Sequence, residues 1–309
     1  MMKNSKTSKV IKFTLDQILS SKWYYILYII CFSIVGFIFN YNRIMGAIFG
    51  AEALANEMAI DAKDAVSVIQ MLFLIVLYFV ILLYGTSIAN SVVEEKSGRI
   101  IETLLCYVKP SQLLVGKVTG YLISVIIQAG VVGGFMVFMS KMCGSESDTL
   151  AMAASQVDIK YYFLFVGSLI LGFLMYATVY AAFASFADNS QDSTQLVLPL
   201  TMVMMLAYLI GLVILRGTSG AWSLYVPYLP LLSSILLPMT AQMDTISWGM
   251  VAIDLIIEAV EMVALVAIGS KLYRRGIVSY GEKPFFGWMH KKNSSSNRNY
   301  KQYRVEANS

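Results

Sequence analysis

Six stretches of the chain are apolar over the length that a helix needs to cross a bilayer. Each runs for roughly 20 residues without Lys or Arg, enough to cross a hydrocarbon core of about 30 Å. In lipid a backbone must satisfy its own hydrogen bonds, so the stretches are predicted to be helices. We expect an all-α integral membrane protein with six spans, at about residues 23–41, 68–92, 118–139, 161–187, 194–215 and 248–269.

The basic residues are divided unevenly between the two sides of these spans. With the N-terminus inside, 18 of the 23 Lys and Arg residues fall in cytoplasmic segments and five on the outer side. Cytoplasmic loops retain positive charge, so both termini are predicted to be cytoplasmic, N-in and C-in. Residues 1–22 would form a cytoplasmic N-terminal segment and 23–270 the transmembrane domain. Residues 271–309 would form a basic tail, held near anionic lipid and disordered beyond about residue 286.

The first apolar run raises the alternative of a cleaved signal peptide. It has some 19 residues, whereas a cleavable core has about 7–15, so we expect it to remain as an anchor.

One outer segment, at about residues 225–241, is apolar but rich in proline. Pro227, Pro230 and Pro238 remove backbone donors and break helices. Two interpretations stay open: a re-entrant piece that lines a cavity, where broken backbone is tolerated at membrane depth, or a loop in the headgroup region.

The composition restricts the class of function. Hydrophobic residues make up 58% of the chain and charged residues 14%, with a mean hydropathy of +0.67. These values exclude disorder, and a net charge of +4 does not suit a nucleic-acid-binding surface. A phosphate-binding loop is absent, since Gly116-Lys117 is followed by Val118 and Ser111 stands where the first Gly is needed. The three cysteines and His290 form no metal-ligand pattern. We therefore expect no enzyme activity and no cofactor on this chain.

A short amphipathic helix is predicted on the cytoplasmic side at about residues 94–105. Ile101, Leu104 and Leu105 have helical spacing opposite a charged face. The helix would lie on the lipid surface or dock onto a partner protein.

This segment carries a family resemblance. The run Glu94-Glu95-Lys96-Ser97-Gly98-Arg99-Ile100-Ile101-Glu102-Thr103-Leu104-Leu105, with Val108-Lys109-Pro110-Ser111-Gln112-Leu113-Leu114-Val115-Gly116-Lys117 after it, resembles the signature of permease subunits of ABC-2 type transporters. The ending is similar to the sodium-exporter-like branch: Leu229-Pro230-Leu231-Leu232-Ser233 and Leu237-Pro238, then Tyr273-Arg274-Arg275-Gly276-Ile277 and Tyr280-Gly281. Together these motifs cover about residues 10 to 284.

The resemblance implies a type V exporter-like transmembrane domain that works with a separate ATP-binding subunit, on which ATP and Mg²⁺ would bind. It also implies a second copy or a homologous permease, in a bacterial cytoplasmic membrane. The cytoplasmic helix would fit a groove on the ATPase, a role that the motif assigns to Glu94, Glu95, Lys96, Gly98, Arg99, Glu102 and Leu105. The substrate stays open among sodium, drugs, lipid-like molecules and antimicrobial peptides. In the sodium-exporter-like branch the loop between the first and second spans is long, whereas here it has only about 25 residues. The substrate of that branch is therefore not assigned to this protein.

Three acids lie inside the last predicted span. Asp254, Glu258 and Glu261 are spaced at i, i+4 and i+7 and share one helical face. Glu258 would lie about 15 Å below Trp248, near the bilayer middle, where a charge costs at least about 2.5 kcal/mol. The acids would line a translocation path, or they would hydrogen-bond to Ser, Thr or Tyr side chains at a subunit interface.

Two rival functions follow from the same sequence. The acids could serve an autonomous ion-coupled transporter or channel, although no internal inverted repeat supports this. The second rival is a membrane anchor or sensor that transports nothing and protects the cell against a peptide or drug.

Overall fold

The computed structural model describes residues 2–20, 24–25, 28–29, 32–33, 62–142, 158–216, 221–240 and 247–279. All regular elements within these ranges are helical, and they contain no β-strand. The all-α prediction is therefore confirmed for this part of the chain. Most of the predicted first span and the predicted disordered tail lie outside the described residues.

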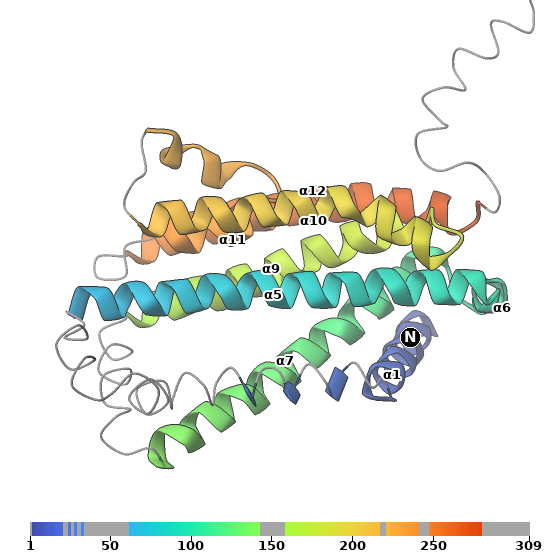
Figure 1. The fold of residues 1–309 in the computed structure, drawn as a ribbon. Helices are drawn as coiled ribbons and strands as arrows, with labels where there is room; N and C mark the ends of the chain where they lie inside the picture. Colours follow the sequence, from blue (N-terminus) through green and yellow to red (C-terminus); the bar gives the residue numbers. More distant parts are fainter. Residues whose placement is uncertain are drawn as a thin grey trace, which may run out of the picture.

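The long helices form an elongated bundle. Figure 1 shows α5, α9, α10 and α12 running along one another, while α7 departs from them obliquely. The elements are α1 (Met2–Ser20), α5 (Ala62–Ser97), α6 (Ile100–Tyr107), α7 (Pro110–Met142), α9 (Ile159–Ala184), α10 (Ser190–Leu215), η2 (Ala221–Leu224), η3 (Val226–Tyr228), α11 (Ser233–Thr240) and α12 (Trp248–Gly276).

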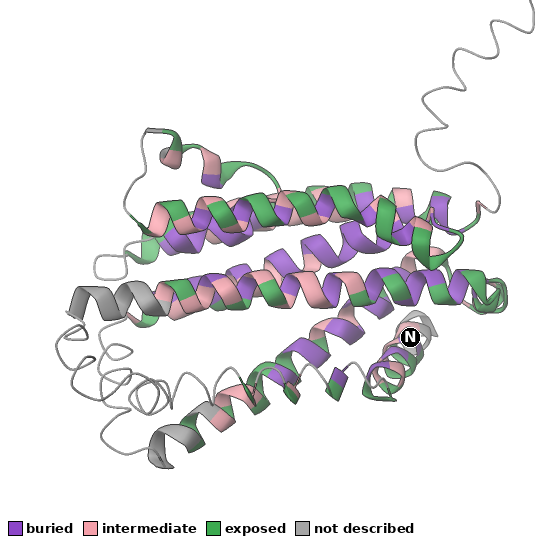
Figure 2. Cartoon of the chain, in the orientation of Figure 1, coloured by how far each residue is buried: buried purple, intermediate pink, exposed green. Residues whose placement is uncertain are grey.

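Helix α9 lies at the centre and packs against α5, α7, α10, α11 and α12. Its second half is almost entirely buried, as the purple ribbon in Figure 2 shows. Glycines allow the close approach of its neighbours. A Cβ added to Gly269 of α12 would lie 2.9 Å from Thr178 Cγ2, and one added to Gly172 would lie 2.6 Å from Ser234 Cβ of α11. Small residues at such crossings let helices pack tightly in lipid.

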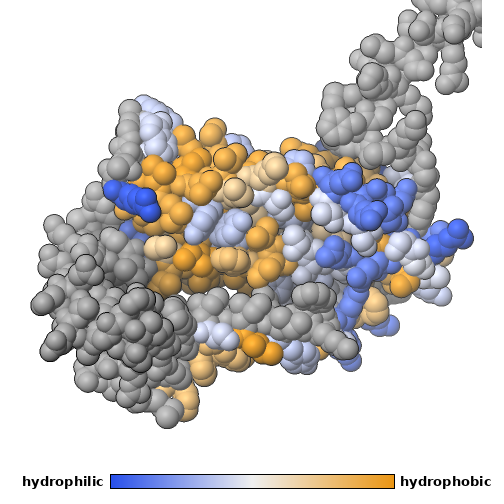
Figure 3. All heavy atoms as spheres, in the orientation of Figure 1, coloured by the Kyte–Doolittle hydropathy of each residue, from blue (hydrophilic) through white to orange (hydrophobic). Residues whose placement is uncertain are grey.

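Four helices in the described part are long and apolar enough to cross a membrane. They overlap four of the six predicted spans, and Figure 3 shows hydrophobic side chains along the middle of the bundle. These segments are Gln70–Ser97, Pro110–Phe135, Ile159–Ala184 and Ser190–Leu215. The predicted sixth span lies within α12, whose three acids distinguish it from these four helices. The first and sixth spans stay predictions.

The helix predicted at residues 94–105 is divided in two. Residues 94–97 are the last turn of α5, and α6 begins only at Ile100. Between them Arg99 adopts a left-handed conformation with φ 55°, which a continuous right-handed helix does not allow. Backbone bonds from Gly98 N–H to Glu94 O (3.0 Å) and from Arg99 N–H to Lys96 O (3.1 Å) close the turn.

The N-terminal segment forms a helix, α1, that sequence reasoning treated only as a cytoplasmic segment. Val10 and Thr14 are buried against α7. Added Cβ atoms on Gly116 and Gly120 of α7 would lie 2.5 Å and 2.9 Å from these two side chains. Glycines four residues apart leave room for the partner helix, which is why α1 and α7 meet here.

The proline-rich segment turns back into the bundle. After η2 and η3, residues 233–239 of α11 are all buried and pack against α9 and α10. The Tyr161 hydroxyl of α9 donates to Pro238 O at 2.8 Å, and the Tyr176 hydroxyl donates to Leu231 O. Side chains of α9 thus satisfy carbonyls that the broken backbone leaves free. Its depth in the membrane stays a prediction.

Candidate functional site

Helix α6 has one buried face and one exposed face. Ile101 is fully buried, and Leu104 and Leu105 are half-buried against the core, as their helical spacing predicted. On the opposite side Glu102 is exposed, and Tyr107 is 74% exposed. Among the described elements α6 packs chiefly on α5. It therefore presents an accessible surface of mixed polarity, which includes Ile100 at 47% exposure, at the end of the bundle where α5 finishes.

The residues that the motif assigns to this surface are separated by the structure. Glu94, Gly98, Arg99 and Glu102 are exposed, and Leu105 is half-buried. Glu95 and Lys96 are 3% and 1% exposed, and both are turned into the bundle. Their charges are occupied by internal contacts, so they do not belong to the free surface around α6.

Glu95 forms an ion pair with Lys117 of α7. Lys117 Nζ lies 2.8 Å from Glu95 Oε2 and also donates to Ser91 Oγ at 3.0 Å. One turn further along α7, the Tyr121 hydroxyl donates to Ser87 O of α5 at 3.3 Å. The facing sides of α5 and α7 are therefore joined by polar contacts at the end nearest α6.

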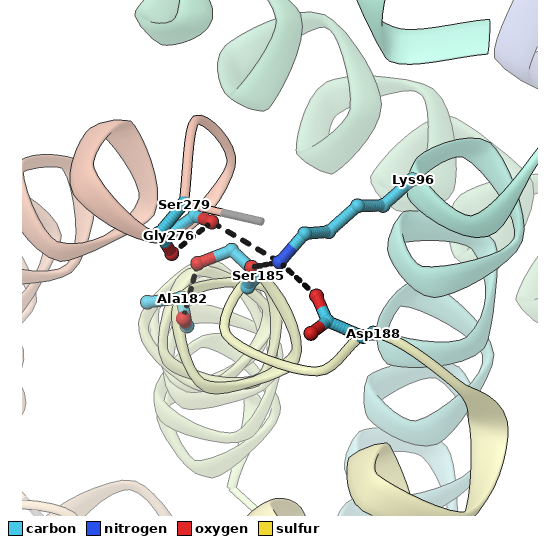
Figure 4. Close-up of polar contacts among 6 residues, drawn as sticks. All are labelled: Lys96, Ala182, Ser185, Asp188, Gly276 and Ser279. Carbon is cyan, nitrogen blue, oxygen red and sulfur yellow. Dashed lines mark hydrogen bonds and ion pairs between the residues drawn. The ribbon is translucent and has the colours of Figure 1, made fainter. Parts of the chain in front are cut away.

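Lys96 is placed at the ends of two other helices (Figure 4). Its ammonium donates to Ser185 O at 2.8 Å, directly after α9, and to Gly276 O at 3.3 Å, the last residue of α12. It also lies 3.1 Å from Asp188 Oδ1, in the α9–α10 connection. Helix C-termini carry free carbonyls and partial negative charge, so one buried cation stabilises both ends.

The same junction requires a glycine at position 276. An added Cβ would lie 2.0 Å from Ser185 Oγ and 3.0 Å from Ser185 C. No side chain fits there without moving α12 away from α9, so Gly276 keeps its carbonyl within reach of Lys96.

Sequence reasoning did not find Lys117 or Asp188. Lys117 was considered as part of a missing phosphate-binding loop, as one of the cytoplasmic basic residues and as the end of the ABC-2 signature run, but not as a partner of Glu95. A signal was present, because a lysine that is followed by a long apolar run and lies seven residues inside a helix needs a buried acid. The identity of that acid depends on the crossing of α5 and α7, which lie in separate parts of the chain.

The three acids of α12 lie at a second polar location. The Ser168 hydroxyl of α9 donates to Glu258 Oε1 at 2.7 Å, and Glu258 is only 2% exposed. The Ser233 hydroxyl of α11 donates to Glu261 Oε2, while Asp254 is half-buried. Hydrogen bonds to Ser, Thr or Tyr were one of the two expected arrangements, and the two serines that contact Glu258 and Glu261 belong to the same chain.

One carboxylate oxygen of this cluster has no hydrogen-bond partner among the described residues. Glu258 Oε2 is buried and has no hydrogen-bond partner among the described residues. Within that part of the chain no Lys or Arg pairs with the three acids. No group of three or more His, Cys, Asp or Glu side chains there is placed to hold a metal ion.

Taken together, the apolar helices define a multi-pass helical membrane protein. Residues 55–271 match the family described as ABC-2 family transporter protein, and the chain belongs to that family.

Two curated relatives are similar to the chain, and both are uncharacterized proteins. The uncharacterized protein YhaP of Bacillus subtilis (strain 168) is 24% identical over 223 residues, covering 70% of this chain and 52% of the relative. The uncharacterized protein MJ1024 of Methanocaldococcus jannaschii is 21% identical over 210 residues, covering 68% and 50%. The chain thus spans about half the length of these relatives.

Proposed function

We propose that this protein is the membrane-spanning permease subunit of an ATP-driven ABC exporter. A separate ATP-binding subunit would bind ATP and Mg²⁺, and its movement would drive efflux of a substrate that is still unidentified. The observation that carries the proposal is the combination of membership in the ABC-2 family with a short helix, α6, that is buried on one face and exposed on the other.

The proposed docking surface consists of the exposed residues of the α5–α6 turn and α6: Glu94, Arg99, Glu102 and Tyr107. It offers charges of both signs beside an aromatic ring, and charge-assisted hydrogen bonds to a partner are stronger than neutral ones. Buried Ile101 holds the helix on α5 while the outer face binds. Glu95 and Lys96, which the motif included, are excluded from this surface by their burial.

The proposed topology has six spans with both termini in the cytoplasm of a bacterial cell. Figure 3 shows hydrophilic side chains at the end of the bundle where α5 and α12 finish. That end includes exposed Lys109, Lys271, Arg274 and Arg275, as expected of a cytoplasmic face. A second copy or a homologous permease would complete the transporter, and the basic tail would lie on anionic lipid.

A second candidate function is favoured by one observation, the unpartnered buried oxygen of Glu258. An acid at membrane depth is a functional candidate by default, and an ion-coupled transporter would use it directly. Within the exporter proposal, Asp254, Glu258 and Glu261 would instead line the translocation path.

The proposal is tested by asking whether an ATP-binding subunit stays bound to α6. The native complex is purified in mild detergent and examined by native mass spectrometry, for the wild type and for a variant with Glu94→Ala, Arg99→Ala and Glu102→Ala. We expect the wild type to retain the subunit and the variant to lose it. A matched control replaces Asp158 and Lys160, an ion pair at the far end of α9, and should retain it.

Absence of any nucleotide-binding partner from the wild type, even after crosslinking in native membranes, would refute the exporter proposal. The acids of α12 would then become the centre of an ion-coupled mechanism.

A further inference from the structure

Two neighbouring residues of opposite charge at the end of α5 extend to different helices. Glu95 contacts α7, while Lys96 contacts the ends of α9 and α12. We propose that Glu95 and Lys96 form an ionic clamp through which a displacement of α6 moves α7 on one side and α9 with α12 on the other. This inference rests on the proposed function, because it assumes that an ATP-binding subunit moves α6.

The position of α6 makes α5 the route for such a movement. Among the described elements α6 packs chiefly on α5, and the turn between them is closed by short backbone hydrogen bonds. Only Ser97, Gly98 and Arg99 separate Lys96 from the first residue of α6. A force on α6 is therefore delivered to the last turn of α5, where Glu95 and Lys96 lie.

The Lys96 arm reaches helices that have no direct chain connection to α6. Its ammonium contacts Ser185 O, Gly276 O and the Asp188 carboxylate within 3.3 Å. The lysine side chain is fully buried, so its ammonium is shielded from solvent, while the Asp188 side chain is 42% exposed. The tight approach of Gly276 to Ser185 means that α9 and α12 move together at this point.

The Glu95 arm connects α5 to α7 at the same end of the bundle. Lys117 Nζ is held by both Glu95 and Ser91, one turn apart on α5, so the pair fixes the register of the two helices. An apolar pair of similar volume would give comparable stability, because burying charges is costly. Paired charges are directional, however, and favour one alignment of the helices over a sliding contact. We therefore assign Glu95 and Lys96 as positioning residues.

The experiment follows the response of single helices to nucleotide in the assembled transporter. The permease is purified with its ATP-binding subunit, placed in lipid nanodiscs and labelled with a fluorescent thiol probe sensitive to its surroundings. Native Cys106 is exposed on α6 and reports on that helix, with Cys31→Ser and Cys143→Ser removing the other thiols. Two further variants carry Cys106→Ser in addition to Cys31→Ser and Cys143→Ser. One is labelled at Val115→Cys of α7 and the other at Ile268→Cys of α12, and both positions are exposed.

In the wild type, Mg²⁺–ATP should change the signal from all three positions. In Lys96→Met the α6 signal should still change while the α12 signal is lost. Asp188→Asn weakens the same arm at a residue that is 42% exposed, so it serves if Lys96→Met does not assemble. The Asp188→Asn variant should show a reduced α12 response. Lys271→Met, an exposed lysine of α12, is the matched control and should leave every response unchanged.

The second arm is tested by exchange of its charges. Glu95→Lys and Lys117→Glu should each reduce the α7 response, and the two together should restore it. If α12 responds fully in both Lys96→Met and Asp188→Asn, the clamp is refuted while the proposed function stands. If α6 itself does not respond to Mg²⁺–ATP in the wild type, the proposed function fails, and the clamp fails with it.

Discussion

Removal of one charge from the Glu95–Lys117 pair should be far more harmful than removal of both. Two unit charges 2.8 Å apart attract each other by about 6 kcal/mol at an effective dielectric constant of about 20, and this attraction opposes the cost of removing both groups from water. Lys117→Met leaves the Glu95 carboxylate buried without its partner, and such changes cost about 3–5 kcal/mol. Lys117→Met with Glu95→Leu leaves no charge behind and should cost much less than the sum of the two single changes.

The measurement is a double-mutant cycle on the free energy of unfolding. The purified protein is unfolded in micelles with a rising fraction of denaturing detergent, and the loss of helix is followed by circular dichroism. We expect a coupling energy of at least about 3 kcal/mol between the two positions. Additive effects of the single changes would refute the reasoning, since they would mean that the two charges do not interact. Lys271→Met provides the reference for loss of an exposed lysine and should be almost neutral.

Three further changes have defined outcomes. Gly276→Val should lower the melting temperature strongly, because its Cβ would lie 2.0 Å from Ser185 Oγ, whereas Gly133→Ala, with no atom of the described part within 4 Å, should not. Gly116→Leu should displace α1 from α7 and expose the N-terminal segment to limited proteolysis; an unchanged cleavage pattern would contradict the packing. Glu258→Gln should abolish export and leave assembly intact, as measured in vesicles after native purification, and normal export would remove this acid from the mechanism.

The sequence predicted the parts of the fold that depend on local spacing. The apolar stretches became helices because about 20 such residues have no other stable form in lipid. Ile101, Leu104 and Leu105 lie on the buried face of α6 because residues three and four apart share one side of a helix. Gly116 and Gly120 of α7 share one side of their helix for the same reason, and α1 packs on that side.

The sequence did not reveal which charges are free and which are buried. Glu94, Glu95 and Lys96 are consecutive and were all assigned to one charged surface, yet successive residues point about 100° apart around a helix. Glu94 is exposed, while its two neighbours enter the bundle toward different helices. Their partners lie far along the chain, since Ser185 is 89 residues beyond Lys96 and Gly276 is 180 residues beyond it. Such partners depend on tertiary packing, which no local pattern records.

The same holds for the acids of α12. Their shared face followed from the i, i+4 and i+7 spacing, but Ser168 lies 90 residues before Glu258. Ser233 of the proline-rich segment lies 28 residues before Glu261. Only the return of that segment into the bundle brings its serine to α12.

The contacts of Lys96 can form only in a fixed order during synthesis of the protein. As the chain leaves the ribosome, α5 is complete long before Ser185 and Gly276 exist. During that interval Lys96 has neither of its two carbonyl partners, so burying its charge would be costly. A chain that ends between Asp188 and Gly276 supplies two of the three partners of Lys96, and only the completed α12 adds the third.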